Sequence, residues 1–494
     1  MKRLNFLQIL FLFLLNTSSA SVFIGPEDEF EIKKIELYAL KTNTNTDTST
    51  YPISQRMLAN TLSNYREIYQ LVTFHEKLNS FLNQENEFNS EIKINLFSDL
   101  HPVRNISDDW KDKNSLSLKF GFYNKNFATQ LNIHKSNKSF DDSSYYFDDS
   151  YISYTKWNMV FGFGALNRWW GPTHNNNLIL SNFARPSPGI FFNSLEGFEF
   201  RGLFSFLGKA NYSFFINRLE TNREISNPYL VGTRVTIMPF KSLQVGFSRT
   251  LTIGGDNRRE NGDIFIKAFF GALEGADNEV GSFGESELSS LDDYSNQLAA
   301  IDIKYDLPIN EKLLTFYIQQ GAEDGGLDWY QPLSNFTHTV GAELKYEIDG
   351  MLRSYIFEIS KTDSVWHGNP VSGRRFNVIY EHNIYGGYRY RGIPIAAFID
   401  NDSIYTQFSY SEEINDRDLL TIDIFYGDLN KDGSGNSVWG NSANIIRGLK
   451  AKYKRNISNN LEAELKILIT DENLNFINRV IDKNVIGASL SYKF

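Results

Sequence analysis

The sequence predicts an all-β transmembrane barrel of about 18 antiparallel strands, preceded by a small N-terminal α-helical subdomain. Three observations lead to this prediction. Aromatic residues make up 15% of the chain while apolar residues make up only 41%, a combination typical of barrels with aromatic girdles. Apolar and polar residues alternate along most of the chain after residue 90. The predicted strands are joined by connections that are long and short in turn.

The N-terminus has the pattern of a secretory signal peptide over residues 1–20. Lys2 and Arg3 precede the apolar stretch 7–15, and Ser18-Ser19-Ala20 provides the cleavage site. The chain contains no cysteine, so we expect no lipid anchor, disulfide or thiol chemistry. Asp and Glu outnumber Lys and Arg by 59 to 49, which argues against nucleic acid as a partner.

Residues 21–89 have a different pattern from the rest of the chain. Within 29–40, Ile32, Ile35 and Ala39 have helical spacing, and helical spacing returns over 54–82. No apolar run after the N-terminus approaches the length of a spanning helix. We therefore predict a periplasmic helical subdomain over 21–89 and a barrel over 90–494.

The barrel segment shows period-two alternation up to the last residue. In the final strand, apolar residues at 486, 488, 490, 492 and 494 alternate with Gly487, Ser489, Ser491 and Lys493. Alternation by itself fits both a soluble sandwich and a membrane barrel. The terminal Phe494 resembles the signal that the barrel-assembly machinery of the outer membrane reads, so this machinery and outer-membrane lipid are expected partners.

Connection lengths favour the barrel, because short periplasmic turns and long outer loops are the rule in bacterial outer membranes. We predict short links around Asn124, Lys156, Leu207, Pro239, Pro308, Asp349, Ile414 and Ser458. The predicted long links are 98–114, 136–147, 167–194, 218–229, 250–297, 321–336, 361–402, 427–446 and 470–484. Both termini then lie on the side of the short turns. We also expect charged side chains to form a hydrated ion-pair lattice in the lumen, among them Lys119, Asp423, Glu462 and Glu464.

The stretch 159–193 is the most informative part of the sequence. It begins as a Gly-rich strand and then places Arg168 beside Trp169 and Trp170, followed by three asparagines at 175–177. Flat aromatic rings beside Arg and Asn suit a sugar, which has one apolar face and many hydroxyls. An equally acceptable interpretation is a packed loop core with Arg168 stacked on the Trp pair.

Five short segments carry a resemblance to a known family. Trp-Trp-Gly-Pro at 169–172, Leu-Ile-Leu-Ser-Asn at 178–182 and Ala-Arg-Pro at 184–186 occur in that order, and Tyr-Arg-Tyr-Arg-Gly at 388–392 leads to Asp-Asn-Asp-Ser at 400–403. In these segments the chain resembles the Wzi family of outer-membrane capsule-assembly proteins. It has Ala396-Ala397 where family sequences often carry Gly-His.

The resemblance implies a surface lectin that binds capsular polysaccharide, or an exopolysaccharide, and attaches it to the cell without turnover. It also agrees with a helical bundle on the periplasmic side. The aromatic and Arg residues of the predicted outer loops suit an acidic glycan; besides the candidates below they include Trp329, Tyr330, Trp366, Arg374 and Trp439. Our candidate ligand-binding residues are Arg168, Trp169, Trp170, Asn182, Arg185, Tyr388, Arg389, Arg391, Asp400 and Asp402.

Other functions remain open from the sequence. A saccharide channel is one alternative, although the loops 250–297 and 361–402 are expected to fold into the lumen and close it. An outer-membrane hydrolase is another, with Asp400 and Asp402 as a carboxylate pair. Asp428, Asn430 and Asp432 follow the start of a calcium loop, but position twelve holds Trp439 instead of an acid. We expect no cofactor, and the seven His show no zinc spacing.

Overall fold

A computed structural model of the chain describes most of the predicted barrel and part of the N-terminal segment. The described residues are 22–41, 46–58, 87–124, 126–258, 260, 262–269, 295–323, 325–328, 331–333, 336–365, 374–375, 379–382, 384–433 and 437–494. The expected signal peptide lies outside them. So do most of the second predicted helix and the loop residues Trp329, Tyr330 and Trp366.

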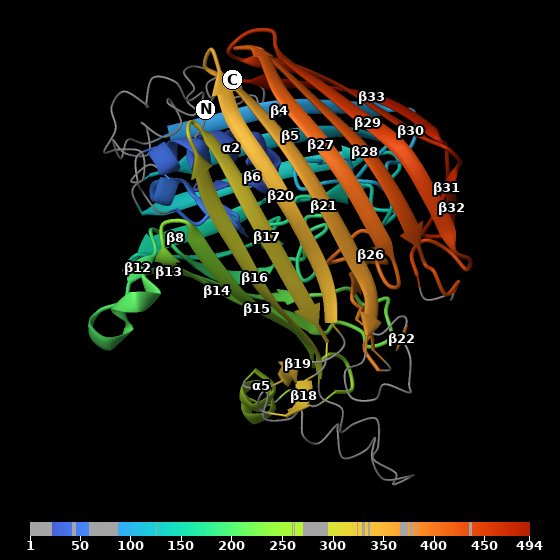
Figure 1. The fold of residues 1–494 in the computed structure, drawn as a ribbon. Helices are drawn as coiled ribbons and strands as arrows, with labels where there is room; N and C mark the ends of the chain where they lie inside the picture. The colour runs from blue at the N-terminus through green and yellow to red at the C-terminus, as the bar shows by residue number, and fades with distance from the viewer. Residues whose placement is uncertain are drawn as a thin grey trace, which may run out of the picture.

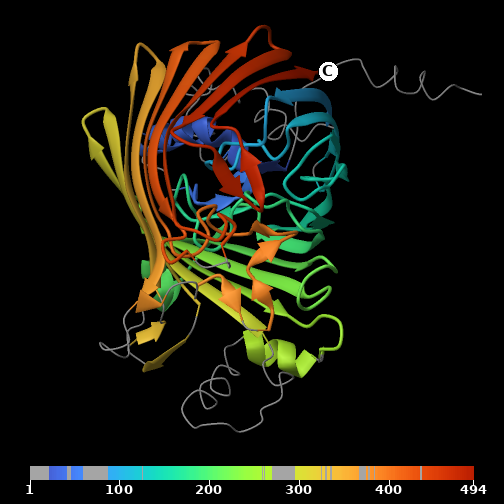
Figure 2. The same cartoon turned by 90° about the vertical axis from the view of Figure 1, so that its right-hand side faces the viewer.

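The fold is a closed antiparallel barrel (Figures 1 and 2), which confirms the predicted fold class and strand number. The first strand pairs with the last, with Lys93 opposite Ser491. The eighteen wall strands are β4 (Glu87–Phe97), β5 (Asn114–Tyr123), β6 (Phe127–Ser136), β8 (Tyr151–Lys156), β9 (Met159–Gly164), β11 (Gly189–Ser194), β13 (Lys209–Arg218), β14 (Tyr229–Phe240), β15 (Leu243–Ile253), β16 (Ser295–Ile309), β17 (Lys312–Ala322), β20 (Phe336–Ile348), β21 (Met351–Val365), β27 (Ile404–Asn415), β28 (Asp418–Leu429), β29 (Asn444–Asn456), β30 (Leu461–Thr470) and β33 (Asn484–Lys493).

Shorter strands extend the wall or form small sheets inside and beside it. Those in the wall are β7 (Tyr145–Tyr146), β12 (Phe198–Glu199) and β22 (Arg374–Arg375). The others pair as β1 (Phe23–Ile24) with β3 (Ile53–Ser54), β2 (Thr50–Tyr51) with β10 (Trp169–Trp170), β18 (Gly325–Asp328) with β19 (Gln331–Leu333), β23 (Glu381–His382) with β24 (Gly386–Gly387), β25 (Arg389–Tyr390) with β26 (Ile393–Pro394), and β31 (Leu474–Phe476) with β32 (Arg479–Ile481).

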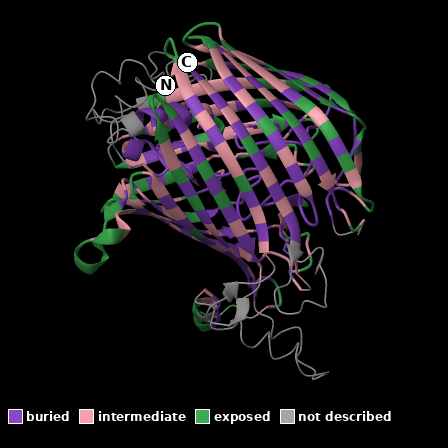
Figure 3. Ribbon diagram, in the orientation of Figure 1, coloured by how far each residue is buried: buried purple, intermediate pink, exposed green. Residues whose placement is uncertain are grey.

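The wall exposes apolar side chains and buries polar ones, and Figure 3 shows how buried and more exposed positions alternate along the strands. In β33, Ile486, Leu490 and Tyr492 are exposed on the outside while Ser489 and Ser491 are buried on the inside. A large exposed apolar surface is disfavoured in water but suits contact with lipid. The alternation therefore has the polarity of a membrane barrel. None of the helices in the described part of the chain is long and apolar enough to cross a bilayer.

At the end that carries the termini, tight turns join the wall strands everywhere except at residues 195–208, and longer loops lie at the other end (Figure 1). Asp349 and Gly350 both have positive φ, 52° and 78°, as a two-residue hairpin turn that matches the strand twist requires. We call the end with the tight turns the periplasmic end and the other the outer end, because this segregation is the rule for outer-membrane barrels.

One pair of predicted connections is wrong. The predicted outer loop 167–194 ends earlier, because β11 begins at Gly189, and the connection around Leu207 is not short but runs from 195 to 208. Residues 189–194 alternate well, with Phe191 buried inside and Ile190 exposed outside. By contrast, Gly197 and Gly208 take positive φ values of 77° and 68°, which end regular pairing. This connection contains the 3₁₀ helix η3 (Gly202–Leu207).

The N-terminal segment lies inside the periplasmic mouth of the barrel, where Figure 2 shows it in blue. The 3₁₀ helix η1 (Pro26–Asp28) leads into α2 (Glu29–Lys41), which confirms the first predicted helix. Three α2 side chains form ion pairs with lumen-facing wall residues: Lys33 with Glu343, Lys34 with Glu413, and Glu36 with Lys345. Division of the chain at residue 90 into a helical subdomain and a barrel stays a prediction.

The outer loops fold inward over much of the lumen. Loops 98–113, 165–188, 366–403 and 430–443 contribute to one apolar cluster that includes Leu100, Leu178, Phe398 and Trp439. Inward folding was expected for 361–402, and its described part confirms it. It was also expected for 250–297, and there the prediction is wrong for the described part, because helix α5 (Gly262–Phe269) packs against Val231 and its neighbours on the outside of the wall.

Candidate functional site: the outer loops and their core

The two tryptophans of the 159–193 stretch lie deep in the barrel. Trp169 pairs with Tyr51 of the N-terminal segment in a two-stranded antiparallel sheet. Its indole N–H donates to the carbonyl oxygen of Thr173 at 2.7 Å, and Gln319 of the wall donates to the carbonyl oxygen of Trp170 at 2.8 Å. The two side chains are only 2% and 1% exposed. They connect the outer loop to the N-terminal segment and the wall.

Arg168 is also buried, but its partner is not the Trp pair. Its guanidinium lies 4.1 Å from the ring centre of Phe215 and donates to the carbonyl oxygen of Leu166 at 3.2 Å. Among the described residues, no carboxylate lies within ion-pair distance of it. Burial lowers the pKa of Arg168 to about 9. The packed-core arrangement therefore describes this residue, with Phe215 in place of the tryptophans.

The three asparagines that follow shape a tight loop around one wall carboxylate. Glu358 accepts hydrogen bonds from the backbone N–H groups of His174 at 2.7 Å, Asn175 at 3.0 Å and Asn176 at 3.1 Å. The side-chain oxygen of Asn177 accepts from the N–H groups of residues 179 and 180, both at 3.1 Å. The side chain of Asn177 thus fixes the loop backbone, an ordinary use of Asn in turns, whereas Asn175 and Asn176 take part through their backbone N–H groups.

Arg185 is the centre of a buried charge cluster. Its guanidinium contacts Asp112 at 2.6 Å, Asp148 at 2.9 Å and Asp141 at 3.2 Å, and lies 3.3 Å from the ring centre of Tyr146. Burial alone would lower the pKa of Arg185, but Asp148 and Asp112 outweigh it and hold the pKa above its ordinary value. Burial would likewise raise the pKa of Asp141, yet Arg185 lowers it to about 2. The cluster joins loop 98–113 and hairpin 137–150 to the 165–188 loop.

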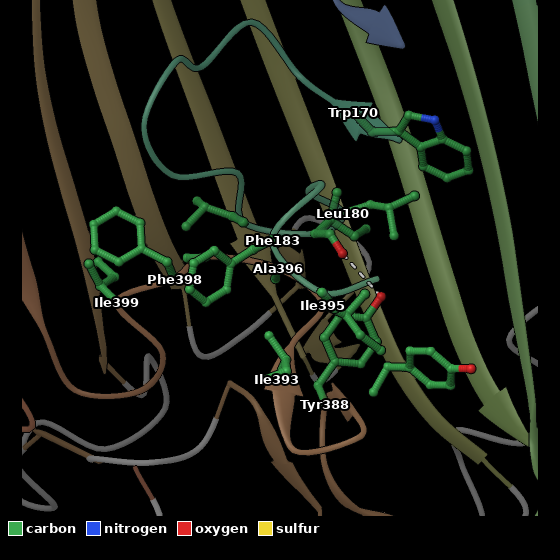
Figure 4. Close-up of a cluster of buried hydrophobic side chains, with 14 of the residues drawn as sticks. Trp170, Leu180, Phe183, Tyr388, Ile393, Ile395, Ala396, Phe398 and Ile399 are labelled. Atoms are coloured by element: carbon green, nitrogen blue, oxygen red, sulfur yellow. Dashed lines mark hydrogen bonds between the residues drawn. The ribbon is translucent and has the colours of Figure 1, made fainter. Parts of the chain in front are cut away.

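The five family-like motifs fall into two family-like segments, residues 169–186 and 388–403, and these two segments meet inside the barrel (Figure 4). The hydroxyl group of Tyr388 donates to the carbonyl oxygen of Ile179 at 3.0 Å, and that of Tyr380 donates to the carbonyl oxygen of Leu178 at 3.0 Å. The hydroxyl of Ser181 donates to the carbonyl oxygen of Ala396 at 2.6 Å. Segments more than 200 residues apart in the chain therefore form one core.

Asn182, Asp400 and Asp402 also form hydrogen bonds within this core. Asn182 donates from its side chain to the carbonyl oxygen of Ile106 at 2.8 Å. Asp400 accepts from Arg389 at 2.8 Å and from the N–H group of Val438 at 2.9 Å. Asp402 accepts instead from the N–H group of Asp432. Asp400 and Asp402 thus bind different partners, and the geometry does not present them as a carboxylate pair facing a common space.

Two carboxyl groups in this region have raised pKa values. Burial raises the pKa of Asp402 to about 6; the hydrogen bond from the N–H group of Asp432 opposes this, while the carboxylate of Asp432 adds to it. Burial raises the pKa of Glu381 to about 7, although Arg389 opposes this. Both groups therefore change charge near neutral pH, and both lie in the described part of the loop between β21 and β27.

Arg391 differs from the other candidates because its side chain is 41% exposed. It bonds the hydroxyl of Ser143 and lies 3.5 Å from Asp141. A second arginine, Arg479 in β32, reaches the same hairpin, with contacts to Asp142 at 2.5 Å and to the carbonyl oxygen of Ser139 at 2.8 Å. Two arginines from different loops thus lie on the outer surface of hairpin 137–150. We call Arg391, Arg479 and residues 139–143 the arginine surface.

The sequence analysis did not predict three features of the site: the role of Arg479, a groove at the outer end and a cavity in the lumen. A groove of about 370 Å³ lies at the outer end beside the 474–481 hairpin, and its lining includes Asn444, Arg447, Asn473 and Asn475. A cavity of about 280 Å³ lies in the lumen. Its lining includes Lys119, Asp423, Glu462 and Glu464, the residues predicted to form a lumen lattice, and Glu462 and Asp423 do form ion pairs with Lys454 and Lys450. Nothing local in the sequence distinguishes an arginine that remains exposed from one that becomes buried.

The calcium-like segment has hydrogen-bonded partners of its own. Asp428 lies in β28, and Asn430 donates from its side chain to the carbonyl oxygen of Gly440 at 2.8 Å. Within the described ranges, no group of three or more His, Cys, Asp or Glu side chains is placed to hold a metal ion. Calcium binding by Asp428, Asn430 and Asp432 stays a prediction.

A sequence profile of the capsule assembly protein Wzi matches residues 83–478, which is most of the chain. The chain belongs to the Wzi family. This confirms the family resemblance, and the protein is an outer-membrane β-barrel. The two family-like segments of the sequence are the ones that the structure brings into contact.

Two relatives support the assignment. A solved structure of Wzi from Escherichia coli, described as an outer-membrane protein involved in group 1 capsule assembly and a carbohydrate-binding β-barrel, is 18% identical and matches with a TM-score of 0.78. The match covers 96% of this chain and 100% of that one, and at this identity it shows a shared fold. An uncharacterized 55.8 kDa protein from the cps region of Klebsiella pneumoniae is 27% identical over 216 residues, which span 43% of this chain and 40% of that protein.

Proposed function

We propose that this Wzi family protein binds an acidic capsular polysaccharide or exopolysaccharide at its outer surface and attaches it to the cell without cleaving it. The observation that carries the proposal is the loop core. Because outer loops pack together inside the barrel, a long polymer meets the protein at its outer end rather than in a passage. The carbohydrate binding described for the Escherichia coli relative supports the same conclusion.

Within this proposal the ten candidate residues have two kinds of role. Arg391 contacts the glycan from the arginine surface, together with Arg479, and the nearby groove supplies amide groups for hydroxyls. The buried candidates, among them Trp169, Trp170, Asn182 and Arg185, position the loops that carry this surface. Any binding by the arginines is local, because the whole chain carries a formal net charge of −10, which repels an acidic glycan.

Genetic deletion tests the proposal directly. Cells without the gene should release polysaccharide that wild-type cells keep at their surface, with the total amount unchanged. Purified protein should bind the isolated glycan, and binding should weaken as salt is added, because exposed charges are screened. Equal retention of polysaccharide by deletion and wild-type cells would contradict the proposal.

The alternative of a hydrolase with Asp400 and Asp402 as its acids is not favoured by their geometry, because the two carboxylates bind different partners, but it has a test of its own. It predicts shortened glycan after incubation with the protein and no shortening with an Asp400→Ala variant.

Recognition of the last strand by the barrel-assembly machinery remains part of the proposal for biogenesis. It rests on Phe494, whose N–H group donates to the carbonyl oxygen of Ser90 in the first wall strand at 2.9 Å.

A further inference from the structure

The 3₁₀ helix η3 exposes an unusual amount of apolar surface. Leu203, Phe204 and Phe206 are 84%, 56% and 65% exposed, and no residue of η3 is buried. An exposed apolar patch of this kind marks a surface that contacts either lipid or another protein. η3 is separate from the outer loops, since it belongs to a connection at the periplasmic end.

The base of this connection is held by several bonds, so η3 has a defined place. The side chain of Asn158, in the neighbouring turn, donates to the carbonyl oxygen of Gly197 at 2.6 Å and accepts from the N–H group of Glu196 at 3.1 Å. Phe198 and Glu199 pair with β13, and the N–H group of Gly208 donates to the carbonyl oxygen of Ser205 at 3.1 Å. The apolar side chains are therefore presented by a folded element.

The direction of η3 decides between membrane and periplasm. Figure 1 shows it as the green coil beside β12 and β13, and Figure 3 shows the same coil as exposed. In this view, which the two figures share, it extends sideways from the outside of the wall and not onward along the barrel axis. A membrane lies across the axis of a transmembrane barrel, so a sideways projection from the rim runs along the bilayer surface.

The surroundings of η3 are those of a membrane interface. At the same rim, Trp157 is 78% exposed and stacks under Lys156 at 4.2 Å, and Phe240 is 69% exposed. Aromatic residues gather at the two interfaces of outer-membrane barrels. Arg201 at the start of η3 is exposed, and a long cationic side chain reaches lipid phosphate while its stem stays in apolar surroundings.

We propose that η3 is a lipid anchor in the inner, phospholipid leaflet of the outer membrane. Leu203, Phe204 and Phe206 insert at the level where acyl chains begin, and Arg201 contacts lipid phosphate. The apolar surface of η3 continues the lipid-facing wall through Phe198, which favours lipid over a second copy of the chain or a periplasmic protein. The anchor fixes the depth of the barrel on one side.

Site-directed spin labelling tests the proposal, since the chain has no cysteine and single-cysteine variants are labelled at one position only. Phe206→Cys and Phe204→Cys are each labelled and reconstituted in vesicles of phosphatidylethanolamine and phosphatidylglycerol. Ile467→Cys on the outside of the wall is the lipid control, and Asp416→Cys in a periplasmic turn is the water control. Heat-dependent migration in gels checks that each variant is folded.

The anchor predicts that labels at 204 and 206 are more accessible to oxygen than to a water-soluble nickel complex, as at 467. Equal accessibility to that at 416 would overturn it. Spectral broadening that disappears when labelled protein is diluted with unlabelled protein would assign the surface to a second copy and overturn it as well. No periplasmic protein is present in these vesicles, so protection by such a partner does not confuse the result.

Discussion

The hydroxyl group of Tyr388 donates a hydrogen bond to the carbonyl oxygen of Ile179 at 3.0 Å, across 209 residues of sequence. The same hydroxyl lies 2.9 Å from that of Thr250 in the wall. One phenol thus connects the two segments that carry the family likeness and attaches both to the barrel. The outer loops are therefore one packed unit, and changes inside it are expected to affect the surface that it carries.

Removing this hydroxyl should weaken the loop core. Tyr388→Phe leaves the carbonyl of Ile179 without its donor in a buried site, which costs about 1–3 kcal/mol. We expect a lower free energy of unfolding in urea for the refolded barrel in detergent. Tyr154→Phe, whose ring is exposed on the outside of the wall, is the matched control and should unfold like the wild type. An unchanged Tyr388→Phe variant would show that the bond contributes nothing.

Arg185 should be among the most sensitive positions in the loops. Arg185→Ala leaves Asp112, Asp141 and Asp148 buried without their cation, and breaking a buried ion cluster in this way costs about 3–5 kcal/mol. Thermal unfolding should shift to lower temperature. Adding Asp141→Ala should recover part of the loss, because one uncompensated charge is removed. A double variant less stable than the single one would contradict the cluster as described.

The raised pKa of Asp402 predicts a pH dependence with a definite sign. Burial raises the pKa of Asp402 to about 6, above the ordinary value of an aspartate, so the folded state binds this proton more tightly than the unfolded state does. The stabilisation of the folded state by this proton is complete below a pH of about 4, and it is lost as the pH rises through about 6. Asp402→Asn should remove this loss. The difference in melting temperature between variant and wild type should grow between pH 4 and 7 in favour of the variant.

The packed loop core predicts that the protein conducts poorly. Reconstituted into planar bilayers, it should show no stable ohmic conductance, whereas an open porin in the same bilayers provides the positive control. Deleting residues 22–58 should not by itself create a stable pore, because the outer loops still pack inside the barrel. A large, steady conductance in the full chain would favour the channel alternative.

Arg391 should affect glycan binding more than stability. Arg391→Ala removes one exposed charge, and exposed ion contacts contribute about 0.2–1 kcal/mol, so we expect about 1.4- to five-fold weaker binding of an acidic polysaccharide. The salt dependence of binding should become shallower at the same time. Arg417→Ala, an exposed cation in a periplasmic turn, is the control and should bind normally. Equal affinities for the two variants would remove Arg391 from the proposed surface.

Much of the fold was predictable from local pattern. Alternation along each strand, as in Ile486 to Tyr492, reports directly which side faces lipid, because successive side chains point to opposite faces. Turn residues such as Asp349-Gly350 mark the tight links in the same local way. The wrong prediction at 167–208 has a local cause too. Residues 198–207 are rich in apolar residues and have the composition of a strand, but positive φ values at Gly197, Gly202 and Gly208 interrupt the pairing.

The sequence by itself determined the closed lipid-facing wall and the family, since both rest on periodicity and on short motifs. Only the tertiary structure decided that Trp169, Trp170 and Arg185 lie beneath the surface while Arg391 and Arg479 lie on it. The physical reason is that burial in a loop depends on contacts between segments far apart in the chain. Ile179 and Tyr388 come into contact only after the barrel has closed around them, and no local sequence pattern predicts that contact.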